Sequence, residues 1–362
     1  MIASLPTVVV ANLHRRYTGV SATVAALIPS QRQYREIAVL DTGRLGLGGE
    51  VSLLQVIRQG WAKTRNQAGL PEGRCRVLHA RRDVDLILGW VLKHLFRQPW
   101  RVVFTSAAPK PPGRVLAALI DSADAVVATS KKAARFVGRA DYVIPHGVDT
   151  QVFSPDGDRP AIVPSALQGQ RLVGCFGRLR YSKGLDLLVD ALIACLPRHP
   201  AYSGVISGLC QSGDQAFVEA QIQKISAAGL TQRIVFIGDL PPQEIPKWYR
   251  MLSIYVAPSR SEGFGLTPFE AMASGIPVIT SQAGVWGDLI DPSFGLQFIT
   301  GDARDLEAKL DALMSDETSC DLLGKNARQA AKERFSIESE AHALELAYRD
   351  QLEIGNSERV KS

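Results

Sequence analysis

The alternation of short apolar runs with helical stretches is the feature that most constrains the fold of this chain. The runs are continuously apolar, as in strands that are buried on both faces of a parallel sheet. Helical periodicity fills most of the gaps, for example over Leu185–Leu196 and Ala216–Ala228. The pattern predicts an α/β protein whose parallel sheets are covered by helices. The expected strands are Thr7–Ala11, Glu36–Leu40, Arg101–Thr105, Ala125–Thr129, Tyr142–Pro145, Leu172–Phe176, Ser203–Ser207, Arg233–Ile237, Ile254–Ala257 and Pro277–Thr280.

The apolar runs form two series, which indicates two domains within the 362 residues. Between the series, the stretch from Asp156 to Gln170 is rich in Gly and Pro and has no clear periodicity. We therefore expect a first α/β domain over residues 1–160 and a second over residues 161–336.

Charge is unevenly distributed along the chain. Residues 1–150 hold 21 Lys and Arg against 10 Asp and Glu, a net charge of +11, whereas the remaining residues hold 20 against 26, a net charge of −6. A basic first half could face an anionic small molecule, an anionic membrane surface or nucleic acid. The sequence has no nucleic-acid-binding module and no interleaved aromatic residues for base stacking, so no nucleic-acid partner is expected.

Cysteine usage and the N-terminal sequence indicate a cytoplasmic protein. The odd count and the lack of a C-x-x-C pair are typical of free thiols in a reducing compartment. The N-terminus has no basic leader followed by a long apolar stretch, and no run approaches the ~20 apolar residues that span a bilayer. We expect at most a peripheral attachment to a membrane surface. The cysteines are Cys75, Cys175, Cys195, Cys210 and Cys320.

Ligands of open parallel sheets bind beyond the carboxyl ends of the strands, so polar residues just after strands are the first candidates for a site. The segment Gly177–Gly184 follows the expected strand Leu172–Phe176 and precedes a helix that begins at Leu185. Arg178 and Lys183 would lie beside the unpaired N–H groups of that helix, which attract anions such as a diphosphate. A solvated loop with ordinary surface cations explains the spacing equally well.

A second polar segment, Ser261–Glu270, follows the expected strand Ile254–Ala257. Its glycines would let backbone N–H groups approach a ligand closely. Glu262 lies in the loop and Glu270 in the first helical turn, so that each could bind a diol, one on a sugar and one on a ribose. Two carboxylates at one strand end therefore form a candidate site.

Both acids also have a purely structural interpretation. Thr267-x-x-Glu270 fits a capping box, in which Thr267 is the N-cap, Pro268 takes the first helical position and Glu270 bonds the N-cap amide. Glu262 stands between a Ser and a Gly, where turn chemistry would place an acid as readily as a ligand would. The local sequence leaves these alternatives open.

The first half of the chain offers weaker candidates. His146 lies in the turn Ile144–Asp149 and could titrate or bind phosphate, although a lone His in a turn is usually structural. Gly19 precedes an expected helix and, with Arg15 and Arg16, could form a second anion cradle. A single glycine makes this a weak signal.

Two further segments, His79–Asp83 and Thr105–Ser106, could reach a cleft from strand ends. Surface charge and strand capping explain them as well.

Taken together, these segments resemble the retaining glycosyltransferases of family 4. The pair Glu262 and Glu270 matches the E-x7-E motif of that family. The segments Gly177–Gly184, Ile144–Asp149 and Gly275–Val278 match it in the same order along the chain. The match spans nearly the whole sequence.

The resemblance implies the GT-B fold, two Rossmann-like domains with parallel sheets that face a central cleft. The second domain would bind a nucleotide-sugar donor and the first an acceptor. The last helix, near Ile337–Leu352, would cross back to the first domain, so that residues 337–362 belong with residues 1–160.

The resemblance also implies roles for individual residues. Arg178 and Lys183 would hold the diphosphate, Glu262 would contact the transferred sugar, Glu270 would bind the ribose hydroxyls, and Gly19 would bring backbone near the phosphates. No protein nucleophile, metal ion or other cofactor would be required. The expected catalytic residues are Arg178, Lys183 and Glu262, and the expected donor-binding residues are Gly19, Gly177, Arg178, Lys183, Glu262, Gly263, Phe264, Gly265, Leu266 and Glu270.

A closer resemblance is to bacterial lipopolysaccharide core mannosyltransferases, and it is carried by the segments Arg15–Val20, His79–Arg82, Phe104–Ala108 and Ala257–Pro268. It implies GDP-mannose as the donor and an anionic inner-core sugar on lipid A (Kdo type) as the acceptor, reached at the cytoplasmic face of the inner membrane. The basic first half fits such an acceptor independently. The acceptor-side candidates are Arg15, Arg16, His79, Arg81, Arg82, Ser106 and Lys110.

Two positions depart from the family pattern. Many members carry a His where this chain has Thr105–Ser106, and an Asn where it has His146. The alternatives are a family 4 enzyme that uses another nucleotide sugar or acceptor, a GT-B sugar-nucleotide epimerase, and a non-catalytic nucleotide-sugar-binding protein.

Overall fold

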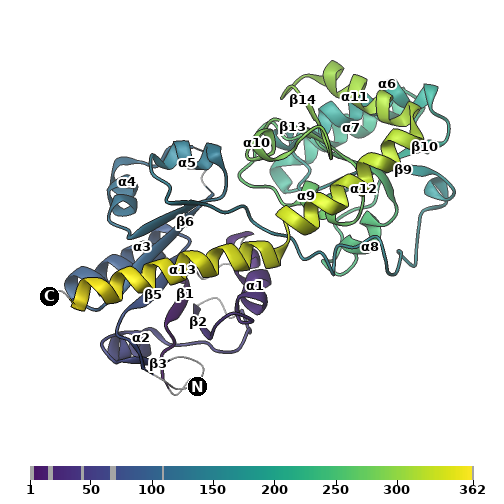
Figure 1. The fold of residues 1–362 in the computed structure, drawn as a ribbon. Helices are drawn as coiled ribbons and strands as arrows, with labels where there is room; N and C mark the ends of the chain where they lie inside the picture. Colours follow the sequence, from purple (N-terminus) through teal and green to yellow (C-terminus); the bar gives the residue numbers. More distant parts are fainter. Residues whose placement is uncertain (1–3, 15–18, 42–44, 66–70, 108–109, 361–362) are drawn as a thin grey trace. The chain divides into compact units, whose positions relative to one another are not determined.

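The computed structural model describes residues 4–14, 19–41, 45–65, 71–107 and 110–360. The chain divides into two compact units (Figure 1). Unit 1 comprises Met1–Gly147 and Ile337–Ser362, and unit 2 comprises Val148–Ser336. Each unit has a parallel sheet with its own core, so the expected α/β fold with two parallel sheets is confirmed.

The sheet of unit 1 is built from β1 (Val8–Asn12), β2 (Ile37–Asp41), β5 (Arg76–Ala80), β6 (Trp100–Ser106), β7 (Ala125–Ala128) and β8 (Tyr142–Val143). The strands are parallel and lie in the order β2-β1-β5-β6-β7-β8. Successive residues point to opposite faces, so Val8 packs into one core and Val9 into another. Both faces are buried, which is why the strands are continuously apolar in the sequence. A small antiparallel ribbon pairs β3 (Thr64–Arg65) with β4 (Pro71–Gly73).

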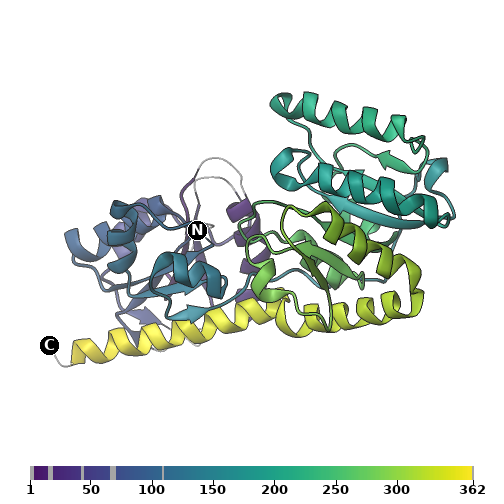
Figure 2. The same cartoon turned by 90° about the horizontal axis from the view of Figure 1, so that it is seen from above.

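Helices cover both faces of this sheet. They are α1 (Gly19–Gln31), α2 (Leu53–Gln59), α3 (Asp83–Trp90), the π-helical turn η1 (Val91–Leu95), α4 (Arg114–Asp121), α5 (Lys131–Val137) and α13 (Ile337–Val360). One core joins α1 and α13 through Leu27 and Leu344. On the opposite face, Val56 of α2, Leu92 of η1 and Ile120 of α4 pack against the strands. Helix α13 runs along the sheet of unit 1 (Figures 1 and 2).

The sheet of unit 2 is built from β9 (Arg171–Phe176), β10 (Tyr202–Ser207), β11 (Ile234–Phe236), β12 (Leu252–Ala257), β13 (Val278–Ser281) and β14 (Leu296–Phe298). These strands are also parallel, in the order β11-β10-β9-β12-β13-β14. Chain order therefore runs outward from β9 in one direction and from β12 in the other.

Two helical layers enclose this second sheet. The helices are α6 (Leu185–Cys195), α7 (Gln215–Ala227), α8 (Ile245–Tyr249), α9 (Thr267–Ala273), α10 (Trp286–Leu289), α11 (Ala303–Ser315) and α12 (Glu317–Arg334). One core holds Leu188 of α6, Ile225 of α7 and Leu310 of α11. The other holds Phe269 of α9 and Ala327 of α12. Short 3-10 turns lie at Ser165–Leu167, Tyr181–Lys183, Leu196–Arg198 and Ser212–Asp214.

The sequence did not reveal every strand. Strand β5 escaped prediction because it begins with Arg76 and contains His79, both of them buried. The guanidinium of Arg76 donates to the carbonyls of Ala62 (2.7 Å) and Gly60 (3.3 Å), and burial lowers its pKa to about 10. A polar residue whose partners lie elsewhere in the chain hides a buried strand from a search for apolar runs. The short β14 escaped as well.

The boundary between the units follows Gly147 and not residue 160 as expected. The segment 148–160 is irregular, but side chains of unit 2 hold its backbone. Arg250, after α8, and Arg328, on α12, both donate to its carbonyl groups. The acceptors are Val152, Ser154 and Asp158 for Arg250, and Thr150 and Phe153 for Arg328.

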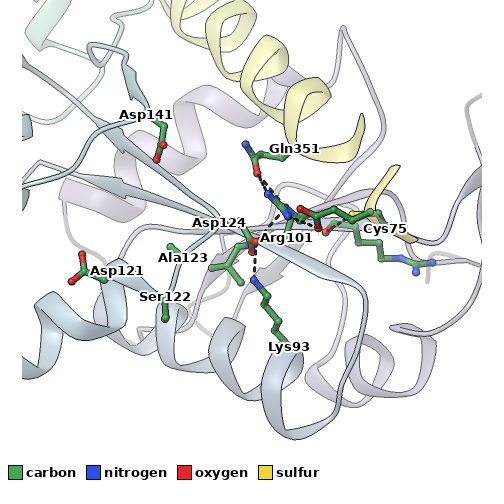
Figure 3. Close-up of polar contacts among 12 residues, drawn as sticks. Cys75, Lys93, Arg101, Asp121, Ser122, Ala123, Asp124, Asp141 and Gln351 are labelled. Atoms are coloured by element: carbon green, nitrogen blue, oxygen red, sulfur yellow. Dashed lines mark hydrogen bonds and ion pairs between the residues drawn. The ribbon is translucent and has the colours of Figure 1, made fainter. Parts of the chain in front are cut away.

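Helix α13 is fixed to unit 1 by a charged cluster at the start of β6 (Figure 3). Arg101 donates to Oε1 of Gln351 at 3.0 and 3.2 Å and pairs with Glu358 at 3.0 Å, both on α13. It also pairs with Asp124 at 3.2 Å. At Gly355 an added Cβ would lie 2.3 Å from Sγ of Cys75. The expected last helix therefore continues past Leu352 to Val360, because its final turns pack against the sheet.

Asp124→Asn is expected to destabilise unit 1. Asp124 accepts from Lys93 Nζ (2.7 Å) and the N–H of Val102 (2.8 Å) and forms an ion pair with Arg101, and a neutral amide cannot pair with both cations. Loss of such charged hydrogen bonds lowers the free energy of unfolding by about 2 kcal/mol, measured by urea unfolding. The control is Asp121→Asn, because Asp121 is exposed and lies away from the cluster (Figure 3). Equal effects of the two changes would contradict the assignment.

Candidate functional site

Two polar loops leave neighbouring strands at the centre of the unit 2 sheet. β9 and β12 are adjacent although the chain forms β10 and β11 between them. Such a reversal of strand order opens a crevice at the carboxyl ends of the two strands. The loop after β9 is Gly177–Gly184, and the loop after β12 is Pro258–Leu266. Both segments that the sequence singled out therefore begin at one crevice.

Arg260 joins the two loops. Its guanidinium makes two hydrogen bonds of 2.7 Å to the carboxylate of Asp186 in the first turn of α6. It also lies over the ring of Tyr181, 4.0 Å from the centroid, and its backbone N–H donates to the carbonyl of Ser182 at 2.9 Å. A two-pronged ion pair of this kind fixes both position and orientation.

Two glycines allow the loops to approach closely. Gly184 has φ +71°, and a Cβ there would lie 2.0 Å from the carbonyl oxygen of Pro258. Gly265 has φ +71° as well, and its Cβ would lie 2.5 Å from the ring of Trp286 and 2.7 Å from Cγ of Glu262. Larger residues would be strained at both positions and would push the loops apart.

The loops enclose a pocket of about 90 Å³ in which Lys183 and Glu262 form an ion pair. The side chains of Lys183 and Glu262 keep 25% and 15% of their surface exposed, so both charges are partly withdrawn from water. Oε1 of Glu262 also accepts from the N–H of Gly263 at 3.2 Å. Arg178 lines the same pocket and is exposed. The structure thus brings together the cations and one of the acids that the sequence indicated.

Glu270 lies in a different environment. Its Oε2 accepts from the hydroxyl of Tyr249 at 2.9 Å, and the pocket lining includes Thr267 but not Glu270. The packed surroundings raise the pKa of Glu270 to about 7, even though the Tyr249 hydrogen bond acts in the opposite direction. The capping-box interpretation is wrong, because α9 begins at Thr267 and no side chain caps it.

The other residues expected at the donor site contribute in different ways. Gly177 lines the pocket, with φ +148°. The side chain of Phe264 packs in the core, its ring centroid 5.3 Å from that of Phe269, and the side chain of Leu266 packs against the same core. The N-terminus of α6 follows Lys183 directly, so its unpaired N–H groups favour an anion beside this cation.

Sequence reasoning missed the residues that hold the pocket in shape. Arg260 follows β12 closely, which could have marked it, but its partner Asp186 lies on another element. Tyr249 had no local signal. Trp286, whose Nε1–H donates to the carbonyl of Gly265 at 2.9 Å, had none either.

Unit 1 has a larger pocket, of about 450 Å³, at the carboxyl ends of β5 and β6. Here too the order of strands reverses, between β1 and β5. Four of the seven acceptor-side candidates line the pocket, whereas Arg15 and Arg16 lie outside the described residues. The lining includes Arg81, Arg82, Thr105, Ser106, Lys110 and His146.

His79 is fully buried and does not line this pocket. Its Nδ1 lies 2.5 Å from the hydroxyl of Tyr348 on α13, and its Nε2 lies 2.7 Å from Oγ1 of Thr105. Burial and the nearby Arg81 and His146 hold the pKa of His79 well below its usual range. The neutral imidazole of His79 therefore links strands β5 and β6 to the last helix, which indicates a structural role.

Glu340 of α13 organises the charges beside the pocket. It accepts from Nδ1 of His146 at 3.0 Å and from the N–H of Gly147 at 2.8 Å, and it lies 3.6 Å from a guanidinium nitrogen of Arg81. Burial would raise the pKa of Glu340, but His146 and Arg81 outweigh it and hold the pKa below the usual value.

Arg81 keeps unused hydrogen-bonding capacity. Within the described part of the chain, its buried Nε and Nη1 have no hydrogen-bond partner. Buried donors without a partner are costly, so a bound anion would stabilise this side chain. Gly19 begins α1, and a Cβ there would have no atom within 4 Å, so packing in unit 1 does not require a glycine.

The described residues contain no group of three or more His, Cys, Asp and Glu that could hold a metal ion. Among the same residues, no helix has the length and apolar character needed to cross a membrane.

Known proteins resemble both units. Residues 162–330 match the family described as glycosyl transferases group 1. Over 348 residues the chain is 38% identical to the lipopolysaccharide core biosynthesis mannosyltransferase LpcC of Rhizobium leguminosarum bv. viciae, covering 94% of this chain and 95% of that protein. Over 349 residues it is 37% identical to the lipopolysaccharide core biosynthesis mannosyltransferase LpsB of Rhizobium meliloti (strain 1021), covering 94% and 96%.

A solved structure agrees in fold. The structure of Anabaena Alr3699/HepE in complex with UDP superposes with a TM-score of 0.76 at 18% identity, covering 95% of this chain and 100% of that one. The expected fold class, GT-B with two Rossmann-like parallel sheets, is confirmed.

Glu270→Gln tests the environment of the half-buried carboxyl group of Glu270. Because the pKa of Glu270 rises from 4.5 to about 7 on folding, the folded state binds this proton more tightly than the unfolded chain does. The resulting stability is complete below the unfolded pKa and is lost as the pH rises through about 7. Between pH 4.5 and about 7, the free energy of unfolding of the wild type should fall relative to that of the variant. Below pH 4.5 the difference between the two proteins should stay constant. Urea unfolding across the window measures this.

The control for that experiment is Glu219→Gln, because Glu219 is an exposed residue of α7 in the same unit. A constant difference between wild type and Glu270→Gln at all pH values would contradict the raised pKa.

Proposed function

The chain belongs to the group 1 glycosyl transferases and is a hexosyltransferase, and we propose that it transfers mannose from GDP-mannose to the inner core of lipopolysaccharide with retention of configuration. The acceptor in this proposal is an anionic sugar on lipid A. The reaction takes place in the cytoplasm, at the inner face of the membrane that holds the acceptor. Two relatives named as core mannosyltransferases support the choice of sugar and acceptor.

The observation that carries the proposal is the pairing of Lys183 with Glu262 at the crevice of unit 2. A sugar nucleotide presents two chemical groups a few ångströms apart, an anionic diphosphate and a neutral sugar rich in hydroxyls. A cation matches the first group and a carboxylate matches the second. The two side chains neutralise each other in the ion pair, and a bound donor would replace each partner with one of its own groups.

Transfer breaks the bond between the anomeric carbon and the diphosphate. Negative charge grows on the leaving group, where Lys183, Arg178 and the N-terminus of α6 would stabilise it. Glu262 would orient the sugar through its hydroxyls. The acceptor hydroxyl attacks the same face from which the phosphate leaves, and the phosphate oxygen takes its proton. In this scheme the protein supplies no nucleophile, and no metal ion or other cofactor takes part.

Glu270 would bind the ribose of the donor. An ionised carboxylate accepts hydroxyl hydrogen bonds on both oxygens, and the elevated pKa of Glu270 places that ionisation near neutral pH. The hydroxyl of Tyr249 would keep the carboxylate oriented. Backbone N–H groups between Gly263 and Leu266 would complete the donor site of unit 2.

The pocket of unit 1 suits an anionic acceptor. Arg81, Arg82 and Lys110 line it, and Arg81 has buried N–H groups to offer a carboxylate. Ser106 and His146 stand where many family members carry a His and an Asn, so they are proposed to shape acceptor choice. No nucleic acid takes part in this reaction.

A donor panel tests the function. We expect GDP-mannose, combined with a defined lipid A core acceptor, to give a product whose new linkage has the same anomeric configuration as the donor, read by NMR. If a different nucleotide sugar is the only donor that gives product, its sugar replaces mannose in the proposal. Conversion of the donor without acceptor would indicate an epimerase, and donor binding without any product would indicate a binding protein.

Lys183→Ala is expected to lower turnover by about 100-fold, because one preorganised cation at the leaving group is removed. Steady-state kinetics with the productive donor measures the loss, and circular dichroism shows that the variant remains folded. The control is Lys224→Ala, which removes another ion-paired lysine of unit 2, bound to Asp190 on the surface. Unchanged turnover in Lys183→Ala would show that the diphosphate lies elsewhere.

A further inference from the structure

A chain of buried polar groups connects the last helix to the pocket of unit 1. Nε2 of Gln31, at the end of α1, donates to the hydroxyl of Tyr348 on α13 at 3.0 Å. That hydroxyl lies 2.5 Å from Nδ1 of His79, and Nε2 of His79 lies 2.7 Å from Oγ1 of Thr105. All four side chains are buried, and Thr105 is the one that lines the pocket. This hydrogen-bonded relay, defined here as these four residues, therefore ends at the pocket with a threonine hydroxyl.

The donors and acceptors along the relay have one consistent direction. Gln31 gives an N–H to the oxygen of Tyr348, so the single hydrogen of that hydroxyl is left for Nδ1 of His79. Burial holds the pKa of His79 well below its usual range, so the ring is neutral and carries one N–H. Because Nδ1 accepts, the hydrogen lies on Nε2, and Nε2 donates to Oγ1 of Thr105.

Thr105 is left with a hydroxyl hydrogen to donate. Its Oγ1 accepts from His79, so its own O–H has to point away from that bond. Among the described residues, His79 is the one hydrogen-bond partner of this hydroxyl. A buried O–H without an acceptor is costly, and Thr105 faces the pocket, so a group bound there would supply the missing acceptor.

Arg81 contributes further donors to the same end of the pocket. Ala80 of β5 and Phe104 of β6 are paired in the sheet, and Arg81 and Thr105 follow them directly in the chain. Both Arg81 and Thr105 line the pocket, and both act as donors toward it. A carboxylate accepts on both oxygens and donates nothing, whereas a sugar hydroxyl also has a hydrogen to place. Two adjacent donor groups therefore favour an ionised carboxyl group over a hydroxyl.

We propose that Thr105 is a specificity-determining residue that donates a hydrogen bond to the ionised carboxyl group of the acceptor, in a direction fixed by the relay. The assignment rests on the proposed function, which places an anionic acceptor in this pocket. His79 and Tyr348 are positioning residues, because they act through Thr105 and do not line the pocket. An acceptor whose carboxyl group is esterified has no negative charge to match these donors.

NMR of the imidazole rings tests the direction of the relay in the wild-type protein. Two-bond correlations between ring protons and ring nitrogens distinguish the two neutral tautomers of His79. We expect the tautomer with the hydrogen on Nε2, because Nδ1 accepts from Tyr348. The tautomer with the hydrogen on Nδ1 would overturn the proposal, because Thr105 would then donate to His79 and not into the pocket.

Two tyrosine variants assign the His79 signals. Tyr348→Phe removes the partner of Nδ1 and should shift the Nδ1 resonance of His79. Tyr142→Phe is the control, because the hydroxyl of Tyr142 also bonds α13, at Asp350, but belongs to no part of the relay. A shift of the same resonance in both variants would show that His79 does not depend on Tyr348 and would overturn the relay.

Kinetics with a pair of acceptors tests the Thr105 hydroxyl. The pair is a water-soluble core fragment that ends in the anionic sugar, and the methyl ester of that fragment. Thr105→Val keeps the shape of the side chain and removes the donor. It should raise KM by at least about 10-fold for the ionised fragment and by about threefold for the ester, because hydrogen bonds to charged groups are the stronger ones. The KM for the donor should stay unchanged, because the donor pocket is formed within unit 2.

An equal rise in KM for both acceptors would show that Thr105→Val merely disturbs the pocket, and it would overturn the proposal, as would no rise for the ionised fragment. The tautomer measurement on the wild type stands even where Thr105→Val does not fold.

Thr105→Ser and Thr129→Val are the matched controls. Thr105→Ser keeps a hydroxyl between His79 and the pocket, so it should retain the preference for the ionised fragment. Thr129 is a fully buried threonine just after β7, the strand next to β6, and it does not line the pocket. Thr129→Val should leave both KM values unchanged. Loss of the preference in either control would overturn the assignment to the Thr105 hydroxyl.

Binding without turnover separates this proposal from the proposed function. Calorimetry with the ionised fragment and with its ester reports acceptor recognition in the absence of donor. A preference for the ionised fragment that Thr105→Val removes, combined with no product from any nucleotide sugar, would refute the function and leave the role of Thr105 standing. Turnover by Thr105→Val with the wild-type preference for the ionised fragment would refute the role of Thr105 alone.

Discussion

The ion pair between Lys183 and Glu262 is the interaction on which the candidate site of unit 2 depends. Partial burial strengthens the attraction between the two charges, while the loss of hydration opposes it. Such a pair can open for a ligand that replaces both partners at once, an anion for Lys183 and hydroxyl donors for Glu262. Such an exchange requires that the two loops keep their positions. The ion pair between Arg260 and Asp186 holds them, and so does the close contact at Gly184.

The sequence located this site because of a geometric property of parallel sheets. Carboxyl ends of parallel strands share one edge, so residues just after Phe176 and Ala257 had to lie on the same edge of the sheet. Strand order decides whether two such loops are neighbours, and strand order is set by long-range packing that no local pattern encodes. The structure supplied that missing fact, because β9 and β12 are adjacent and Lys183 therefore reaches Glu262.

The predictions failed where a polar residue is buried by partners far away in the chain. Arg76 concealed β5 because its carbonyl acceptors belong to the turn after α2. Glu270 resembled a capping residue because the Tyr249 hydroxyl that binds it lies on another helix. His79 resembled a site residue, yet Tyr348 of α13 holds it in the core. In each case the local sequence allowed two environments, and the difference between them is a tertiary hydrogen bond.

The last helix explains why unit 1 is made of two separated pieces of chain. Glu340 of α13 fixes His146 and pairs with Arg81, so the charges at the pocket of unit 1 depend on residues that follow the whole of unit 2. Closing so long a connection costs little more entropy than closing a shorter one, because that cost rises only with the logarithm of length. The buried carboxylate, by contrast, binds His146 and stabilises the Arg81 guanidinium, which would otherwise be poorly solvated. The arrangement makes completion of the unit 1 pocket conditional on synthesis of the chain that builds unit 2, because α13 follows that chain, whereas unit 2 is one continuous segment.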